Sequence, residues 1–181
     1  MTEDAACWSV HAIHGAVPTR RDAAHLLTGD VKVRHAVESD QSAIVALVRS
    51  ERLNPNDLDW RRFVVASDGV TLVGAVQLRP NSDGSHELSS LVVRPQMRAR
   101  GVAARMIELL IQGGSERLYA VTRPANVARF ARWGFAPIDP HDAPSEVRRR
   151  RRLGLLLGGA LALMRGRRPS ALVVLRYAGL A

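Results

Sequence analysis

A short loop from Arg98 to Ala103 combines residue types that suit the binding of an anion. Its pattern is Arg98-x-x-Gly101-x-Ala103, with Arg100 inside it. If a helix follows, its first amides have no acceptor within the helix, and the helix dipole places a partial positive charge there. Glycine and alanine leave room for a ligand, and arginine donates to phosphate oxygens. The loop therefore predicts a phosphate-binding site, with a packed strand-to-helix joint that binds nothing as the alternative.

The segments on either side of this loop must hold it in place. Leu91, Val92 and Val93 are the last residues of a predicted buried strand, which stops at Pro95. Apolar residues in 102–110 recur at helical spacing, so a helix is predicted to start where the loop ends. The loop is thus expected between a strand and the first turn of a helix.

Hydrophobic patterns along the rest of the chain predict the elements around this joint. Strands are expected at 31–37, 61–69, 70–80, 86–93, 117–122, 135–139 and 170–177, and helices at 38–51, 102–112, 125–133 and parts of 144–166. The order β-α-β-β-β-α-β-α-β predicts an α/β (α+β) domain with a mostly antiparallel mixed sheet flanked by helices. It does not match a dinucleotide fold, whose glycine-rich loop would follow the first strand.

The length of 181 residues predicts one domain. We expect 31–181 to fold, after an N-terminal extension, 1–30, that has weak periodicity and is partly flexible. The single cysteine, Cys7, excludes an internal disulfide framework and fits a reducing cytosol. Glu3 and Asp4 near the start argue against an export signal, so we expect a cytoplasmic protein. No histidine cluster has a second set of ligands, and no metal site is expected.

The net charge of +9 comes almost entirely from the C-terminal part of the chain. Arg148–Arg152, with Arg165, Arg167 and Arg168, contribute +8, which leaves +1 for all other residues. Few aromatic residues accompany these arginines, so base stacking has little support and no nucleic-acid partner is expected.

The basic C-terminal segment, 146–168, encloses an apolar run of twelve residues, 153–164, where a membrane span needs about twenty. Three interpretations are open: an interfacial helix on an anionic membrane, a docking surface for an acidic partner, or a helix packed on the sheet with solvated arginines. The last is favoured because a strand pattern follows and would return the chain to the sheet. No membrane partner is therefore expected.

Two stretches of the chain resemble the GNAT N-acetyltransferase superfamily. In "ELSSLVVRPQMRARGVAARMIELLI", Arg98, Gly101 and Ala103 match the family's acyl-CoA loop, Gln/Arg-x-x-Gly-x-Gly/Ala. In "ANVARFARWGFAPID", the residues around Gly134 match its later Leu-Gly-Phe pattern. The resemblance extends over 31–139, about 60% of the chain, with the motifs in the family's order.

The resemblance implies an enzyme, an N-acetyltransferase, with acetyl-CoA as acyl donor. The loop amides would wrap the pyrophosphate, and the end of the preceding strand would pair with the pantetheine arm. The implied cofactor-binding residues are Leu91, Val92, Val93, Arg98, Ala99, Arg100, Gly101, Val102 and Ala103.

The resemblance also implies a catalytic base. Acetyl transfer requires a neutral amine, whereas a free amine with a pKa of about 10 is mostly charged at neutral pH. Glu87 lies eleven residues before Arg98, the interval at which several family members carry a glutamate base. Glu87 would accept the proton directly or through a water; a rim carboxylate or a hairpin salt bridge is the alternative.

One position departs from the family pattern. Four residues before Gly134, where many members place a tyrosine that protonates the leaving thiolate, this chain has Phe130. A thiol with a pKa of about 8.5 is already a good leaving group, so water, Ser89 or Ser90 could suffice, with Tyr119 as a weaker candidate. The departure keeps open an acyl-CoA-binding regulatory or degenerate module without turnover.

The acceptor is expected to be the amine of a small molecule. Some bacterial N-acetylglutamate synthases resemble this chain around "LYAVTRPANVARFARWGFAPIDPHDAP", so an amino acid leads among the candidates. Its site is expected across the sheet from CoA, where Asp57, Asp59 and Arg61 could contact an ammonium and a carboxylate. The sequence leaves open which amine is used and whether the protein is a homodimer.

Overall fold

The computed structural model describes residues 31–51, 53–112, 117–166, 168–169 and 171–179. The predicted extension, 1–30, lies outside the described residues. The strands are β1 (Lys32–His35), β2 (Phe63–Ser67), β3 (Leu72–Pro80), β4 (His86–Val93), β5 (Leu118–Thr122), β6 (Phe135–Ile138) and β7 (Val173–Tyr177). The helices are α2 (Gln41–Ser50), α3 (Val102–Gln112), α4 (Val127–Ala131) and α5 (Ser145–Met164).

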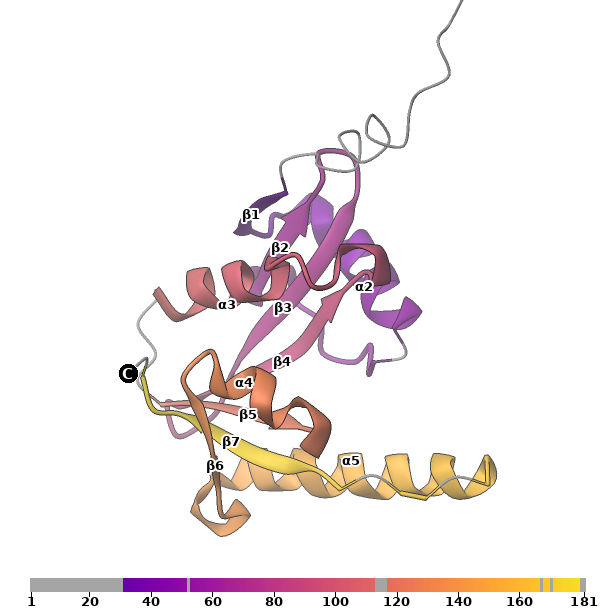
Figure 1. The fold of residues 1–181 in the computed structure, drawn as a ribbon, viewed down its shortest axis with the longest axis vertical. Coiled ribbons are helices and arrows are strands. Elements are labelled where there is room, and N and C mark those ends of the chain that lie inside the picture. The colour runs from indigo at the N-terminus through magenta and orange to yellow at the C-terminus, as the bar shows by residue number, and fades with distance from the viewer. Residues whose placement is uncertain (1–30, 52, 113–116, 167, 170, 180–181) are drawn as a thin grey trace, which may run out of the picture.

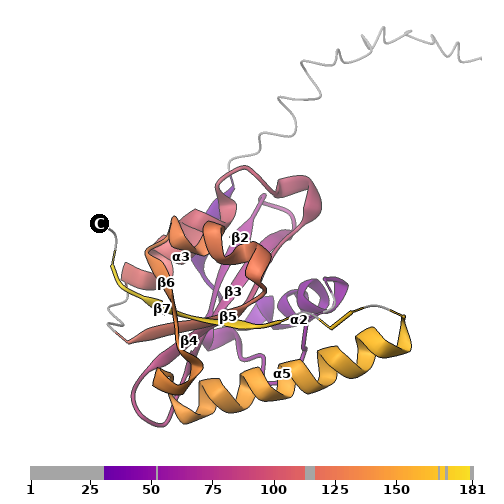
Figure 2. The ribbon, with the colours of Figure 1, turned by 60° about the horizontal axis from the view of Figure 1, so that its bottom comes forward.

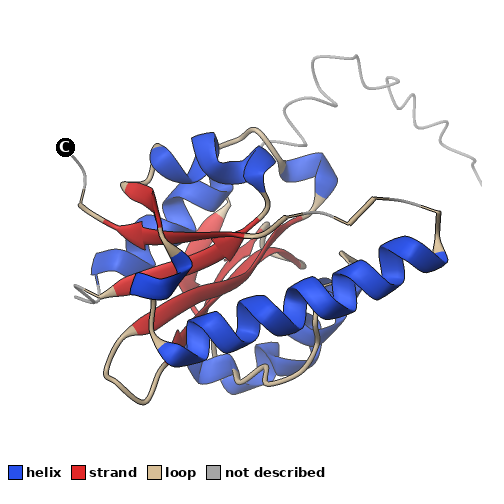
Figure 3. Ribbon diagram, turned by 90° about the horizontal axis from the view of Figure 1, so that it is seen from below, coloured by secondary structure: helices blue, strands red, loops and turns tan. Residues whose placement is uncertain are grey.

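The strands form one mixed sheet in the order β1-β2-β3-β4-β5-β7-β6 (Figure 1). Strands β4 and β5 pair in parallel, and the other neighbouring strands of this sheet pair antiparallel. Helices cover both faces of the sheet (Figure 3). The predicted fold class, a mostly antiparallel mixed sheet flanked by helices, is confirmed.

Alternating side chains of the strands build two separate cores. In β2, Val65 belongs to the buried cluster with Leu47 of α2, whereas its neighbour Val64 belongs to the cluster with Met106 of α3. Successive side chains of a strand point to opposite faces, so α2 and α3 lie on opposite sides of the sheet. This arrangement holds the loop before α3 against the middle of the sheet.

Helix α5 is continuous, although Gly154, Gly158 and Gly159 have low helix propensity. Its first turns pack on the α2 side of the sheet, where Val147 is fully buried beside Tyr119 of β5. Further along, the helix runs outward past the strands (Figures 2 and 3). The prediction of a helix packed on the sheet is correct for these first turns only, because Leu153, Leu156, Leu157 and Leu163 further along the helix are exposed.

Three arginines of α5 contradict the prediction that the arginines of this segment are solvated. Arg148 donates to the backbone carbonyls of His141 and Ala143, Arg150 donates to Asn81 and Glu87, and Arg151 donates to the carbonyl of Leu172. These bonds tie the start of α5 to the turn after β3, to β4 and to the segment before β7. The periodicity of the sequence carried no information about such distant acceptors.

None of the helices in the described part of the chain has the length and apolar content needed to cross a membrane.

Candidate active site

The loop before α3 has the backbone geometry of an anion-binding turn. Ala99 and Gly101 have positive φ angles of 61° and 74°. The amide of Arg105 donates to the carbonyl of Gly101 at 3.1 Å, as in the first turn of a helix, so the amides just before it lie in the part of the helix that has no internal acceptor. Val102 and Met106 are buried and anchor the helix start. Alternating left-handed residues beside a helix N-terminus form a concave set of N–H groups.

Glycine is required at position 101 because of the backbone conformation, and not because a side chain would clash with neighbouring atoms. A side chain added there would meet no atom within 4 Å, so the space beside the loop is open. Its φ of 74° is one that residues with a side chain rarely adopt. The loop therefore combines a backbone conformation that glycine adopts readily with open space beside it, and the sequence pattern had predicted only the space.

The guanidinium of Arg98 braces the loop and does not point away from the protein. Its Nη2 donates to Glu51 at the end of α2 at 2.6 Å, and its Nε donates to the carbonyl of Val93 at 2.9 Å. In this arrangement Arg98 holds the loop between α2 and β4. The predicted contact of its side chain with phosphate would have to be made by Nη1 or compete with Glu51 for Nη2.

Strand β4 separates from β5 next to this loop. The parallel ladder joins only His86–Leu88 to Leu118–Ala120, although β4 continues to Val93 (Figure 1). On the other side, the register with β3 shifts between Ala75 and Gln77, opposite Ser90, whose φ is 52°. A bulge of this kind bends a strand and redirects its edge. The second half of β4 thus has no strand beside it toward β5 within the described residues.

Glu87 is buried at the start of β4, where that strand is still paired on both sides. Only 5% of its surface is exposed, and Nη1 of Arg150 donates to its Oε2 at 2.5 Å and to Asn81 Oδ1 at 2.7 Å. Arg79 lies directly opposite on β3. Burial raises the pKa of the Glu87 carboxyl above its ordinary value, and the guanidinium groups of Arg150 and Arg79 offset only part of that rise.

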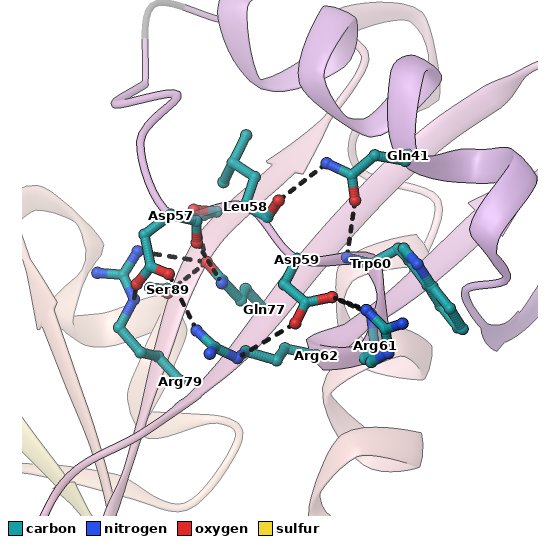
Figure 4. A network of polar contacts seen from close by, with 11 residues as sticks. Gln41, Asp57, Leu58, Asp59, Trp60, Arg61, Arg62, Gln77, Arg79 and Ser89 are labelled. Carbon is teal, nitrogen blue, oxygen red and sulfur yellow. Dashed lines mark hydrogen bonds and ion pairs between the residues drawn. The ribbon is translucent and has the colours of Figure 1, made fainter.

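Asp57, Asp59 and Arg61 lie in one polar network on the α2 side of the sheet (Figure 4). Asp57 contacts Arg62 at 3.1 Å and Arg79 Nε at 3.1 Å, whereas Asp59 caps the short turn that contains Arg61. The two carboxylates therefore already have cationic neighbours. The structure brings together the three predicted residues, together with two arginines that sequence analysis did not identify.

Gln77 connects this network to β4. Its side chain is fully buried, donates to the carbonyl of Asp57 at 2.8 Å, and accepts from the Ser89 hydroxyl at 3.3 Å (Figure 4). Arg79 beside it has a buried Nε with no hydrogen-bond partner in the described structure, because its short contact with Asp57 is poorly aligned. A buried N–H without a hydrogen bond is rare in native proteins, and here its charge is paired with the Asp57 carboxylate 3.1 Å away.

Phe130, which stands at the position of the family's acid, and the candidate acids Ser89, Ser90 and Tyr119 have different surroundings. Phe130 is buried and makes edge-to-face contacts with Trp133 and Phe135, so it serves the core. Tyr119 is also buried, in the cluster beneath α5. Ser89 is half-buried and lies on the part of β4 that has left β5. Ser90, also half-buried, lies on the same part of β4, so both serines are near the gap in the ladder.

Gln77, Arg79 and Arg150 are site residues that sequence analysis missed. Gln77 interrupts the apolar strand "LVGAVQL", and an isolated polar residue on a fully buried strand was the one available signal. Arg150 had no such signal, since it is one of five consecutive arginines and lies 63 positions from Glu87.

Two surface hollows lie away from these residues. One, of about 520 Å³, lies over β6 and β7, and one of about 170 Å³ lies between α3 and Trp133. Neither is lined by a predicted site residue. Within the described residues no group of three acidic, histidine or cysteine side chains could hold a metal ion.

The model of the acetyltransferase (GNAT) family matches residues 34–135, which include both the loop before α3 and Gly134. No protein among the curated proteins matches the chain.

Several solved structures share the fold. N-acetylglutamate synthase from Neisseria gonorrhoeae, complexed with coenzyme A and L-arginine, is 22% identical with a TM-score of 0.62, over 82% of this chain and 34% of that one. Rv2747 from Mycobacterium tuberculosis, in complex with CoA and NLQ, is 23% identical with a TM-score of 0.61, over 82% and 99%. A GNAT-family acetyltransferase from Bacillus cereus is 16% identical with a TM-score of 0.58, over 84% and 100%. The chain thus spans about a third of the Neisseria enzyme, and these identities show a common fold.

Proposed function

Since the chain belongs to the acetyltransferase (GNAT) family, we propose that it moves the acetyl group of acetyl-CoA to the amine of a small molecule. The observation that carries the proposal is the separation of β4 from β5 beside the N-terminus of α3. A ligand with a polar arm and a diphosphate suits both features. The arm would pair with the free edge of β4, and the diphosphate would accept from the loop amides.

The donor would be held mainly by the backbone. Leu91, Val92 and Val93 supply the free strand edge, and the amides of Ala99–Ala103 supply the concave turn. Arg100 lies within that turn, and Arg98 precedes it with one nitrogen bonded to Glu51. Acetyl-CoA brings an activated thioester, and this chain has to orient it and accept a proton.

Glu87 is the group that we assign to accept the proton. The amine nitrogen forms a bond to the acetyl carbon, the carbon–sulfur bond breaks, and the nitrogen gives up a proton to Glu87 directly or through a water. Its raised pKa brings the carboxylate closer in basicity to neutral pH than that of an exposed glutamate. One oxygen, Oε2, is held by Arg150, which leaves Oε1 to act as acceptor.

An amino acid is the acceptor that the polar network favours. Asp57 and Asp59 suit an ammonium group, while Arg61, Arg62 and the unsatisfied Nε of Arg79 suit a carboxylate. These groups lie on β3 and on the segment before β2, on the same side of the sheet as Arg150. The likeness to an N-acetylglutamate synthase supports the same choice.

An acyl-CoA-binding module without turnover is the second candidate. Two observations favour it. Phe130 stands at the position of the family's acid, and the Glu87 carboxylate is already paired with Arg150. Both candidates require uptake of CoA, and only the first releases thiol.

The test combines calorimetry with CoA and thiol release from acetyl-CoA across a panel of amino acids and simple amines. The enzyme proposal requires micromolar-to-millimolar CoA binding together with amine-dependent thiol release. CoA binding without release for any amine would favour the second candidate. Absence of CoA binding by the folded protein would remove both.

Replacement of the proposed base gives a sharper test. Glu87→Gln should lower turnover by about 100-fold or more and leave CoA affinity within a few-fold of the original, because the amide cannot accept the proton. Glu146→Gln is a matched control, since Glu146 bonds the backbone of Ser82 on the surface. An unchanged rate in the Glu87 variant would exclude this carboxylate as the base.

A further inference from the structure

The outer part of α5 exposes large apolar side chains that the fold leaves uncovered. The exposed fractions are 51% for Leu153, 71% for Leu156, 60% for Leu157, 72% for Leu163 and 85% for Met164. By contrast, Val147 two turns earlier is fully buried. Exposed apolar residues that stand alone are common, but five on one helix form a patch that requires an explanation.

These side chains share one face of the helix. At 100° per residue they fall within an arc of about 120°, with Leu163 and Leu156 at one edge and Leu157 at the other. Ala160, also exposed, lies inside the arc. We call these six residues the leucine face. An apolar arc of this width is typical of a helix that packs against another apolar surface.

The opposite side of α5 is already in contact with the protein. Arg151 Nε donates to the carbonyl of Leu172 at 2.9 Å, and a side chain at Gly154 would come within 3.0 Å of the Leu172 side chain. The helix is therefore attached along this side to the segment before β7, as Figure 3 shows. The leucine face points outward from that attachment.

The charges that follow Glu146 along α5 and the chain after it have one sign, and Glu146 itself accepts a hydrogen bond from the backbone amide of Ser82. From residue 147 to the end of the chain the sequence has nine arginines and no aspartate or glutamate. Arg149 and Arg152 are exposed at the start of the face, and Arg165 and Arg168 are exposed beyond its end. Arginine can extend its charged group toward water or phosphate while its stem lies along apolar surface.

We propose that the leucine face and its flanking arginines bind the surface of an anionic lipid bilayer, with α5 parallel to the membrane plane. The apolar run of twelve residues is about 18 Å long, well below the roughly 30 Å of a bilayer core, so it suits the interface. Leucines on one face with arginines at both ends provide apolar burial together with attraction to lipid phosphates.

The charge distribution favours lipid over a second copy of this chain. Two leucine faces in contact, in either direction, would bring exposed arginines of one copy near those of the other, and the one carboxylate of α5, Glu146, is bonded to the amide of Ser82. Like charges in contact oppose association. A bilayer of acidic lipids offers the complementary charge and the apolar phase together.

Flotation of the full chain with vesicles of phosphatidylglycerol and phosphatidylcholine in equal parts tests the proposal. We expect binding to these vesicles and little to phosphatidylcholine alone. Leu156→Gln with Leu163→Gln should weaken binding by about 10-fold or more, and Arg149→Gln with Arg152→Gln by about 5-fold for each charge lost. The matched control is Val70→Gln, since Val70 is 91% exposed on the turn between β2 and β3, away from α5.

Three outcomes would overturn the proposal. The first is no binding of the wild-type chain to the mixed vesicles. The second is binding that salt abolishes but the leucine substitutions leave unchanged, which would indicate charge attraction alone. The third is a wild-type dimer in light scattering that the leucine substitutions convert to monomer without vesicle binding. Thermal melts establish that the variants fold, and the substituted leucines are exposed, so little change is expected.

Discussion

Glu87 and Arg150 form a close pair, and the pair joins two segments 63 positions apart. A carboxylate that is almost fully buried needs such a partner, because an unpaired charge would be costly in the interior. The same burial raises the pKa of Glu87, whereas Arg150 lowers it. The protonation state of the proposed base therefore depends on a residue of α5.

Arg150→Gln should shift the acid limb of the pH profile of kcat/KM. The base works only when ionised, so the rate falls as the pH drops through the raised pKa of Glu87. Removing Arg150 removes a cation that lowers this pKa, so the limb should shift to higher pH. The measurement is a pH profile of thiol release with the preferred amine. Arg149→Gln is the control, since Arg149 is exposed one position away; equal limbs in both variants would contradict the assignment.

Asp40 stabilises the start of α2 through a second residue-scale network. Its carboxylate accepts from Arg34 at 2.6 and 3.0 Å and from the amide of Val37 at 2.8 Å. The hydrogen bond from Arg34 is the main reason that the pKa of Asp40 lies below its usual value. The guanidinium is 44% exposed, so solvent screening reduces the contribution of the ion pair.

Asp40→Asn should lower the free energy of unfolding by about 1 kcal/mol near neutral pH. A lowered folded-state pKa stabilises the fold above the unfolded pKa, and this contribution is lost as the pH falls through the folded value. The difference between the two proteins should therefore shrink in acid. Urea denaturation at neutral pH and near pH 3 measures it. A difference that stays constant would mean that the carboxylate charge has no part in it.

At the scale of elements, the glycine before α3 and the glycine that follows α4 are needed for different reasons. Gly101 and Gly134 have positive φ angles of 74° and 80°. Beside Gly101 there is open space, whereas a side chain at Gly134 would come within 2.5 Å of the carbonyl oxygen of Gly179. The first glycine supports a binding loop, and the second allows the turn after α4 to approach the end of the chain.

Alanine at these two positions should have separable effects. Gly101→Ala should lower the free energy of unfolding by about 1–2 kcal/mol, because alanine disfavours the positive φ at this position. It should also weaken CoA binding, because the loop amides would rotate. Gly134→Ala should cost about 3 kcal/mol or more, because it adds a steric clash with backbone to the same strain. Denaturant midpoints and CoA calorimetry on both variants measure the difference. Equal losses of stability would refute the distinction.

The sequence predicted most elements because their patterns are local. The apolar runs of β2 and β3 on either side of the Asp68-Gly69 turn, the glycine stop after α4 and the helical spacing from Val102 all depend on neighbouring residues. The bulge at Ser90 was not predictable, because it results from the register of β4 against β3. The gap between β4 and β5 follows from that register and from where the ladder ends.

At the scale of the molecule, α5 joins the sheet through its first turns and leaves it afterwards. Val147 in the first turn of α5 is fully buried, whereas Leu157, less than three turns later, is 60% exposed. The two positions offer a comparison within one helix. It separates the part of α5 that supports the fold from the part that we propose binds lipid.

Val147→Ala should lower the free energy of unfolding by about 1–3 kcal/mol, because two buried methyl-sized groups leave a cavity under the helix. Leu157→Ala should change it by about 0.5 kcal/mol or less, since the leucine is mostly in water. Chemical denaturation of both variants provides the measurement. A large loss for Leu157→Ala would show that the outer part of α5 is covered by protein.

The sequence alone determined the strands, the helices, the glycine loop with its free helix amides, and the family resemblance, since each depends on residue types at short spacing. Only the tertiary structure decided that Arg150 pairs with Glu87, that Arg98 bonds Glu51, and that the leucine face of α5 remains exposed. These outcomes depend on which distant segments the sheet brings together. Local periodicity specifies which side of an element is apolar but not what covers it.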